Sequence, residues 1–154
     1  MTPLVLALAV LSGTPSPAHD GDTFRLSGER VRLAGLDAPE LRQRCLDADG
    51  APYPAGVLAR DHLRALIGDH AVTCTFEKRD GFKKRNAAGE IVGRAIGTFG
   101  SLNEAMVRDG WARAAYGHQY DVAEEEARGA RRGIWAGACE DPALVRKRER
   151  EARR

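Results

Sequence analysis

The fold is decided by residues 19–40, which read HDGDTFRLSGERVRLAGLDAPE. Apolar and polar residues alternate on either side of a Ser-Gly pair, with Phe24 and Leu26 before the pair and Val31 and Leu33 after it. Alternation with a period of two is typical of a half-buried β-strand, and a short glycine-containing turn between two such runs is typical of a hairpin. The stretch therefore predicts an antiparallel hairpin with acidic residues close to both of its ends.

Helical signals follow the hairpin in three places. The segment at residues 55–67, AGVLARDHLRALI, is amphipathic and is followed by a glycine that ends the helix. Its apolar stripe is expected to comprise Leu58, His62, Ala65 and Leu66. The sequence SLNE at residues 101–104 is a capping box, in which Ser101 caps a second helix that ends at Gly110. A third helix is expected over residues 121–132.

The remaining strands are predicted between these helices. Alternating patterns place them at residues 70–76, 90–96 and 111–116, and the polar stretches 41–54 and 78–89 are expected to be loops. Short strands with interposed helices favour an α+β domain built on a small β-barrel.

The composition is that of one folded domain. The chain has 154 residues, of which 43% are hydrophobic and 30% are charged, so it can form a core. This excludes a wholly disordered chain, and the absence of a fixed period excludes a repeat array. The apolar run at residues 4–11 is too short to cross a bilayer as a helix, so no membrane span is expected. We expect a monomer.

The charge distribution is more informative than the total. The 24 basic and 22 acidic residues give a net charge of only +2, which does not by itself indicate a nucleic-acid partner. Basic residues are concentrated in residues 77–94 and 138–154. Such clusters on a near-neutral chain favour contact with an anionic partner. For residues 138–154 we prefer the simpler interpretation of a solvated basic tail.

The cysteines and the N-terminus bear on where the protein works. None of Cys45, Cys74 and Cys139 lies in a C-x-x-C pair, so no structural zinc is expected. An exported protein could form one disulfide from these three cysteines, and the sequence does not say which two are paired. Residues 1–18 combine an apolar run with small residues, as a signal peptide does, although no basic residue precedes Arg25; alternatively they form a first strand. We expect a secreted or periplasmic protein, with a cytoplasmic location as the alternative.

Acidic residues at the two ends of the hairpin form the chemical constellation. Asp22 and Asp37, with the backbone carbonyl of Ala38, are oxygen donors of the kind that Ca²⁺ accepts in an irregular shell. Glu40 lies just beyond and could deprotonate an attacking water, and Arg32 could neutralise charge on a phosphate. From spacing alone, Asp-Gly and Asp-x-Pro are also ordinary turn chemistry.

This constellation resembles the opening motif of the staphylococcal nuclease (thermonuclease) family: DGDT, a hairpin, then R-L-x-G-x-D-x-P-E. The later segments SLNEAMVRDGWARAAY and EEEARGARRGIWAG are similar to the closing helices of that family. The resemblance covers residues 19–137, between residues 1–18 and a basic tail at 138–154. It implies a five-stranded OB-fold β-barrel with three helices, and Ca²⁺-dependent hydrolysis of phosphodiester bonds in DNA, RNA or both.

The resemblance also assigns roles to individual residues. It implies that Asp22 and Asp37 are the calcium carboxylates, that Ala38 supplies a carbonyl ligand, and that Arg32 and Glu40 are catalytic. Contacts with nucleic acid are expected from a further set of residues, namely Lys84, Arg85, Arg94 and Tyr116.

One position departs from the family pattern. Counted back without gaps from the second helix, Glu90 stands where the family has a second phosphate-binding arginine. A carboxylate there would repel a phosphate, and Arg94, Arg85 or Lys84 would have to compensate. The alternative function is therefore a catalytically weakened member that binds nucleic acid without cutting it efficiently. A third interpretation is a protein-interaction domain that uses the barrel as a platform.

Overall fold

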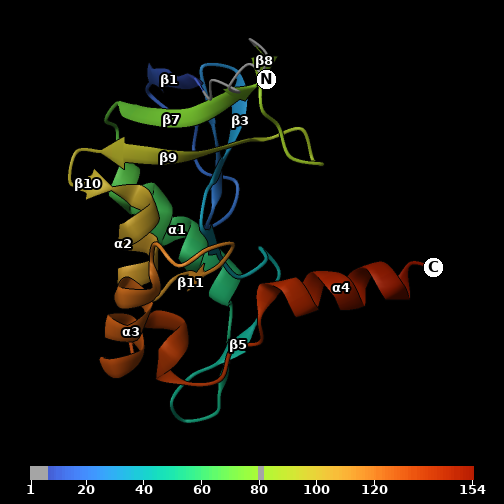
Figure 1. Cartoon of the computed structure of the whole chain (residues 1–154). Coiled ribbons are helices and arrows are strands. Elements are labelled where there is room, and N and C mark those ends of the chain that lie inside the picture. Colours follow the sequence, from blue (N-terminus) through green and yellow to red (C-terminus); the bar gives the residue numbers. More distant parts are fainter. Residues whose placement is uncertain (1–6, 80–81) are drawn as a thin grey trace.

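Figure 1 shows the computed structural model of the chain, which describes residues 7–79 and 82–154. The strands are β1 (Ala7–Gly13), β2 (Thr23–Leu26), β3 (Glu29–Leu33), β4 (Leu36–Asp37), β5 (Cys45–Leu46), β6 (Pro52–Tyr53), β7 (Val72–Arg79), β8 (Phe82–Lys83), β9 (Ile91–Gly97), β10 (Gly100–Ser101) and β11 (Arg113–Ala114). The helices are α1 (Ala55–Ile67), α2 (Leu102–Arg108), α3 (Asp121–Gly129) and α4 (Pro142–Ala152), with a 3-10 turn at Gly133–Ala136. The mixed sheet and the helices make this an α+β protein.

The predicted hairpin is confirmed and forms one edge of the main sheet. Its strands β2 and β3 pair antiparallel, with Thr23 opposite Arg32. Ser27 and Gly28 make the turn with positive φ angles of 49° and 79°, as a two-residue hairpin loop requires. The strand order is β1-β7-β9-β3-β2, with β3 and β9 parallel. This order places β3, the second strand of the hairpin, directly beside β9, with Val31 opposite Ile91.

The closed barrel with three helices is not reproduced in full. β1 and β2 are the two ends of the strand order. Single hydrogen bonds join the neighbouring segments, from the amide of Ser16 to the carbonyl of Arg25 at 3.0 Å, and from the hydroxyl of Ser27 to the carbonyl of Ser12 at 3.1 Å. No ladder closes the barrel in the part of the chain that the structure describes.

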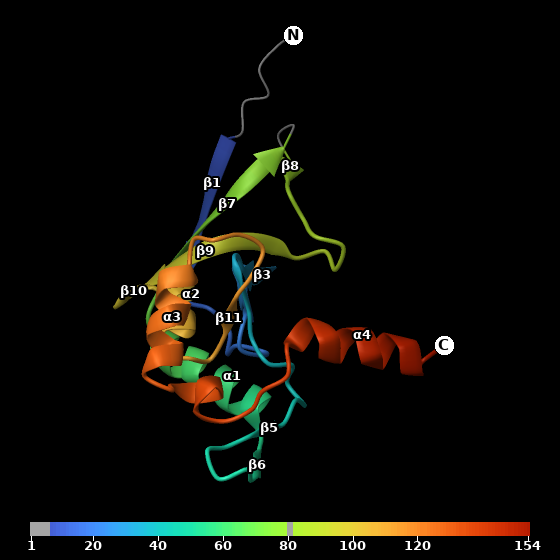
Figure 2. The same ribbon diagram turned by 60° about the horizontal axis from the view of Figure 1, so that its bottom comes forward.

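The C-terminal segment is the larger difference, because it is a helix. Where a solvated tail was expected, α4 projects from the body of the molecule with its far end free (Figures 1 and 2). Asp141 caps it by accepting from the amide of Ala143 at 2.9 Å, and Pro142 occupies the first helical turn. The predicted strand at residues 111–116 is also shorter, since β11 covers only Arg113–Ala114.

Helix α1 has the predicted bounds but a different buried face. Its buried side includes Ala59, Leu63 and Ile67, whereas Leu58 is 39% exposed. Gly56 explains the orientation: a Cβ atom there would lie 1.8 Å from the carbonyl oxygen of Glu40. The first turn of α1 therefore rests directly on the backbone beside Glu40, a contact that hydrophobic spacing does not reveal.

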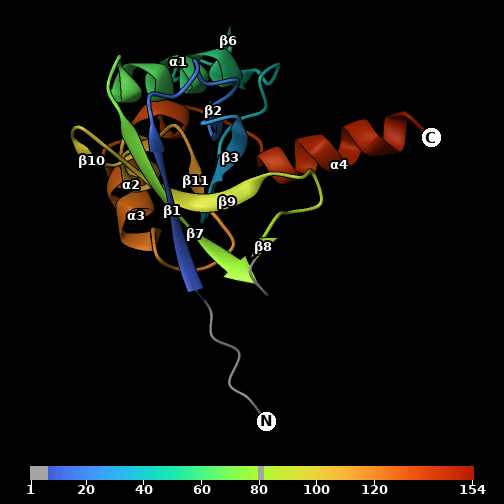
Figure 3. The same cartoon turned by 90° about the horizontal axis from the view of Figure 1, so that it is seen from above.

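The N-terminal strand β1 pairs antiparallel with β7 along its whole length (Figure 3). Residues 1–6, which include part of the signal-peptide-like run, lie outside the described residues. Cleavage after Ala18 would remove β1 from the sheet. In the described ranges, no helix has the length and apolar character needed to span a membrane.

Asn103 ties the sheet to the helices. This fully buried side chain accepts from the amide of Ala95 at 2.9 Å and donates to the carbonyls of Ala34 at 2.9 Å and Gly93 at 3.2 Å. It thereby links α2 to β9 and to the residue that follows β3. A buried side chain with three partners fixes their geometry, because each partner left unpaired is costly.

Replacing Asn103 by alanine is expected to lower the free energy of unfolding by about 2–4 kcal/mol, because buried backbone groups lose their partner. Urea denaturation followed by tryptophan fluorescence measures this change. Glu125→Ala, at an exposed position of α3, is the control and should change stability by less than about 0.5 kcal/mol. A loss below about 1 kcal/mol for the Asn103 variant would contradict the role given to this side chain.

Candidate active site

The hairpin brings the predicted acidic residues to one end of the sheet. Asp22 immediately precedes β2 and Asp37 ends β4, and both are buried, with 4% and 3% exposure. Arg32 on β3 lies between them. Its Nη2 is 3.0 Å from Asp37 Oδ1 and 3.5 Å from Asp22 Oδ2. The structure therefore brings together three of the predicted site residues.

Asp22 is fixed by hydrogen bonds to its neighbours. Its Oδ1 accepts from the hydroxyl of Thr23 and its Oδ2 accepts from the amide of Ala38, both at 3.0 Å. Its own amide donates to Asp20 Oδ1 at 3.1 Å. Burial, and then the negative charge of Asp20, raise the pKa of Asp22 to about 8, and Arg32 opposes this rise. The buried carboxyl of Asp22 therefore holds a proton more tightly than an exposed aspartate does.

Glu40 is held by the loop on which α1 rests. Its amide donates to Gln43 Oε1 at 3.0 Å, and its carbonyl accepts from the amide of Gln43 at 2.7 Å. Its carboxylate is partly exposed and reaches the same region as Asp37. We call the four carboxylates Asp20, Asp22, Asp37 and Glu40 the acidic cluster.

Arg146 of α4 also enters the acidic cluster, and the sequence analysis missed it. Its Nη1 is 2.9 Å from Asp37 Oδ1 and 2.5 Å from Glu40 Oε1, and its Nη2 is 2.7 Å from Asp37 Oδ2. Hydrogen bonding to Asp37 raises the pKa of Arg146, so it stays charged. Asp141 as the N-cap followed by Pro142 in the first turn is a recognised helix start and could have predicted α4. Nothing in the local sequence shows that this arginine returns to the hairpin.

Arg32 has its pKa set by opposing influences. Burial lowers it, and the charges of Asp22 and Asp37 raise it, with a net rise. The charge of Arg146 acts against that rise. Two cationic side chains are therefore close enough to repel each other across a shared carboxylate.

The acidic cluster contains oxygen donors of the kind that a calcium ion accepts. Asp22 and Asp37 are both buried and offer hard carboxylate oxygens. Over the described residues, no group of three or more His, Cys, Asp or Glu side chains is arranged as a metal site. The protein would therefore supply two carboxylates and backbone oxygen, with water or substrate completing the shell.

The carboxylate of Glu90 forms an ion pair with an arginine of the neighbouring strand β3. Its side chain is buried and accepts from Arg30 Nη2 and Asn86 Nδ2, both at 3.0 Å. Arg30 lies two residues before Arg32 on the same face of β3, because side chains alternate along a strand. The carboxylate at position 90 therefore faces a cation, and the expected repulsion of a phosphate is offset by Arg30.

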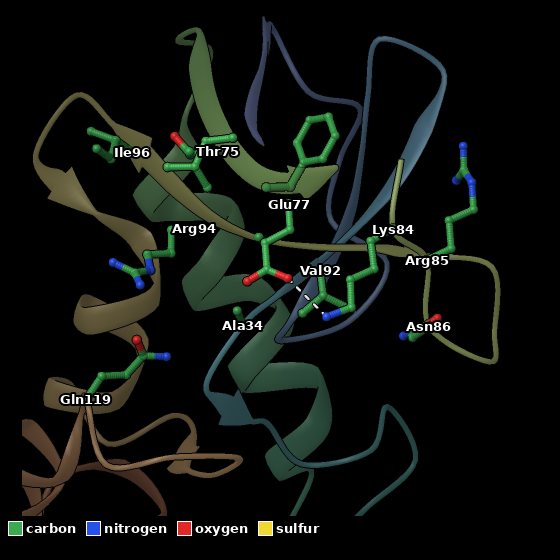
Figure 4. A pocket seen from close by; sticks show the side chains of 13 residues that line it. Ala34, Thr75, Glu77, Lys84, Arg85, Asn86, Val92, Arg94, Ile96 and Gln119 are labelled. Atoms are coloured by element: carbon green, nitrogen blue, oxygen red, sulfur yellow. Dashed lines mark hydrogen bonds and ion pairs between the residues drawn. The ribbon is translucent and has the colours of Figure 1, made fainter. Parts of the chain in front are cut away.

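The basic residues predicted to contact nucleic acid line a separate groove. Lys84, Arg85 and Arg94 border a hollow of about 650 Å³ over the outer face of β7 and β9 (Figure 4). Lys84 pairs with Glu77 at 3.0 Å. Arg85 pairs with Glu29 at 2.8 Å. Figure 4 shows Arg94 directed into the hollow toward Gln119.

Tyr116 lies apart from these three. It is 73% exposed, has a positive φ of 56°, and borders a smaller hollow of about 280 Å³ that also includes Asp37. The structure therefore joins Tyr116 to the acidic cluster rather than to the basic groove.

The base of α4 is anchored by a disulfide between Cys45 and Cys139, which settles the pairing that the sequence left open. Cys74 is a free, buried cysteine. Gln43 Nε2 donates to the carbonyl of Glu140 at 2.7 Å, and Arg113 donates to the carbonyl of Cys139. The disulfide and Gln43 attach the segment before α4 to the loop that carries Glu40, and Arg113 attaches it to β11.

Comparison with known proteins identifies the class to which this fold and site belong. The family model described as Staphylococcal nuclease homologue matches residues 30–137. The chain therefore belongs to the staphylococcal nuclease family, and the resemblance of the opening motif is confirmed.

Relatives of known name are similar over most of the chain. It is 33% identical over 132 residues to Succinoglycan biosynthesis protein ExoI of Rhizobium meliloti (strain 1021), covering 82% of this chain and 66% of the relative. It is 34% identical over 138 residues to Probable endonuclease LCL3 of Schizophyllum commune, covering 79% of this chain and 46% of the relative. An Uncharacterized endonuclease of Escherichia coli is 30% identical over 135 residues, which cover 82% of this chain and 78% of the relative. The chain thus spans from under half to about two thirds of the length of the first two relatives.

Proposed function

We propose that this chain is a calcium-dependent nuclease that hydrolyses phosphodiester bonds of DNA, RNA or both. The observation that carries the proposal is Arg32, held between two buried aspartates at 3.0 and 3.5 Å. Glu40 is joined to one of them, Asp37, through Arg146. A fixed cation next to carboxylates suits a reaction in which negative charge grows on a phosphate. Family membership, and relatives that are named endonucleases, support the same function.

In this proposal Glu40 and Arg32 act on the reacting groups. Glu40 accepts a proton from a water whose oxygen attacks the phosphorus in line with the leaving oxygen. Arg32 donates hydrogen bonds to a non-bridging phosphate oxygen as charge develops on it. The new bond joins the water oxygen to phosphorus, the bond from phosphorus to the leaving oxygen breaks, and the leaving oxygen takes up a proton.

Asp22 and Asp37 would hold the calcium ion, with the Ala38 carbonyl as a further ligand. When bound, the ion would supply charge to polarise the phosphate. The amide of Ala38 already donates to Asp22 Oδ2 at 3.0 Å, which orients that carboxylate. Asp20 accepts from the amide of Asp22 and keeps the turn in shape.

Three finer inferences accompany this proposal. The strand order β1-β7-β9-β3-β2 is interpreted as that of an OB-fold whose barrel is left open between β1 and β2. Arg94, Lys84 and Arg85 contact the nucleic-acid backbone along their groove, while Tyr116 contacts a nucleotide near Asp37. The disulfide between Cys45 and Cys139 supports a secreted or periplasmic location, because such bonds persist in oxidising compartments.

Replacing Arg32 by lysine is expected to lower kcat about 10²–10³-fold, the usual effect of losing one positioned donor to a developing charge. Lysine keeps the charge but not the planar fork. The measurement is the initial rate of single-stranded DNA hydrolysis in calcium. Arg25→Lys, at an exposed position of β2, is the matched control and should keep the parent rate. Equal rates for both variants would contradict the role given to Arg32.

A further inference from the structure

We propose that Arg146 is a second phosphate-binding residue of the nuclease site, supplied by the C-terminal helix rather than by the sheet. This inference rests on the proposed function. It gives α4 a part in holding the scissile phosphate opposite Arg32. The argument has three steps: where the two guanidinium groups meet, what holds α4, and why the sheet lacks a second cation there.

Arg32 and Arg146 converge on a single oxygen atom. Asp37 Oδ1 is 3.0 Å from Arg32 Nη2 and 2.9 Å from Arg146 Nη1, so the two nitrogens lie within about 6 Å of each other. Two guanidinium groups at this spacing can donate hydrogen bonds to different oxygens of one phosphate. The contacts of Arg146 with Asp37 and Glu40 use three of the five N–H donors of an arginine. The other donors can serve a bound anion, which would also relieve the repulsion between the two cations.

The first turns of α4 are anchored to the body of the protein, and this anchoring fixes the position of Arg146. The disulfide at Cys139 lies three residues before the first residue of the helix, Pro142. Pro142 and Val145 are buried against the body, and Val145 immediately precedes Arg146. An arginine in the second turn of an anchored helix loses little freedom when it binds a ligand. Beyond Arg146 the helix is exposed and highly charged, so the anchored turns are the ones that carry the site.

Among the described residues of the sheet, the cations near Glu90 are already paired or lie at the separate groove. Glu90 is paired with Arg30, and Lys84 and Arg85 are each paired with a glutamate at the groove. Arg94 borders the groove over β7 and β9, which Gln119 also lines (Figure 4). Arg146 is a cation that contacts both Asp37 and Glu40. It therefore occupies the position where a second donor to the phosphate is needed.

The opposite role for Arg146 would be that of a plug, which occupies the carboxylates and keeps calcium and substrate out. Both roles use the same contacts, but they predict opposite effects of removing the side chain. A phosphate-binding residue is needed for substrate, and its loss weakens binding and slows hydrolysis. A plug is only an obstacle, and its loss would strengthen calcium binding and speed hydrolysis.

The test compares Arg146→Gln with Lys147→Gln, which removes the same charge from the neighbouring exposed position of α4. Affinity for a deoxynucleoside 5′-monophosphate is measured by calorimetry in calcium. This probe carries a phosphate but no diester, so it reports binding without cleavage. We expect Arg146→Gln to weaken binding about 10–100-fold, the effect of a lost hydrogen bond to a charged group, and Lys147→Gln to leave it unchanged. Arg146→Lys should give an intermediate affinity.

Hydrolysis of single-stranded DNA provides the second readout, and circular dichroism verifies that each variant is folded. We expect kcat to fall about 10²-fold for Arg146→Gln. Unchanged nucleotide affinity would overturn the inference, and so would faster hydrolysis together with tighter calcium binding, which is the result for a plug. If the parent chain does not hydrolyse DNA but Arg146→Gln still weakens nucleotide binding, the proposed activity fails while the phosphate contact stands.

Discussion

Replacing Glu40 by glutamine is expected to lower kcat about 10²–10⁴-fold, the contribution of a positioned general base. Glutamine has nearly the same shape, and its amide oxygen can still accept from Arg146, as Glu40 does at 2.5 Å. The loop is also preserved, because the backbone of residue 40 makes its contacts with Gln43. The substitution removes the capacity to take up a proton and the negative charge that pairs with Arg146, while the shape and the hydrogen-bond acceptor remain. The expected fall is therefore in the rate of hydrolysis rather than in affinity for DNA.

The measurement is a single-turnover rate on single-stranded DNA in calcium, with affinity determined separately. Glu125→Gln, at an exposed position of α3, is the matched control and should behave as the parent. If Glu40→Gln retained more than about a tenth of the parent rate, Glu40 would not be the base. A large fall in affinity with an unchanged rate would instead make it a binding residue.

Removing the disulfide by replacing Cys45 and Cys139 with serine is expected to lower the free energy of unfolding by about 4 kcal/mol. The bond joins residues separated by 94 positions, and cross-links that close long loops restrict the unfolded chain most. The same change should slow hydrolysis, because the segment before α4 loses its covalent link to the loop that carries Glu40. Denaturant unfolding in the absence of reductant measures the stability change.

Reduction provides the internal control for this prediction. A thiol reductant should destabilise the parent protein by a similar amount, while the double serine variant should not respond to it, because Cys74 is free and buried. Similar midpoints for the parent and the double variant would contradict the stabilising role of the bond. A loss of stability with unchanged hydrolysis would show that Arg146 does not depend on the disulfide.

Much of the fold could be predicted because its signals are local. The hairpin followed from alternation around a Ser-Gly turn, and Ser101 caps α2 as expected by accepting from the amide of Glu104 at 3.1 Å. The reciprocal contact of the capping box was not found, since Glu104 pairs with Arg108 at 2.9 Å. The buried face of α1 could not be predicted, because the close approach of Gly56 to the backbone of Glu40 sets it.

The site could be predicted in part for the same reason. Asp22, Arg32 and Asp37 lie within sixteen positions of one another on a single hairpin and its exit, so local pairing brings them together. Arg146 reaches the same carboxylates from 109 positions beyond Asp37. Its approach depends on a disulfide and on packing at the base of α4. These are long-range features that the pattern of charges in the tail does not contain.

Glu90 shows how one residue can mislead when its partner is unknown. Its position in the family motif predicted repulsion of the phosphate, and that prediction assumed an unpaired carboxylate. In the structure Arg30 compensates it at 3.0 Å across the pairing of β3 and β9. The loss of an arginine from the strand is then compatible with a working site, provided that another cation serves the phosphate.

The most direct test of the account is a digestion time course on single-stranded DNA with the purified chain, in calcium and in an excess of EDTA. The account predicts hydrolysis in calcium that stops when the metal is removed, since Asp22 and Asp37 are proposed to hold the ion. Binding of DNA that weakens with salt but leads to no hydrolysis in calcium would contradict the account. That result would show that the protein has a nuclease fold and binds nucleic acid but does not cut it.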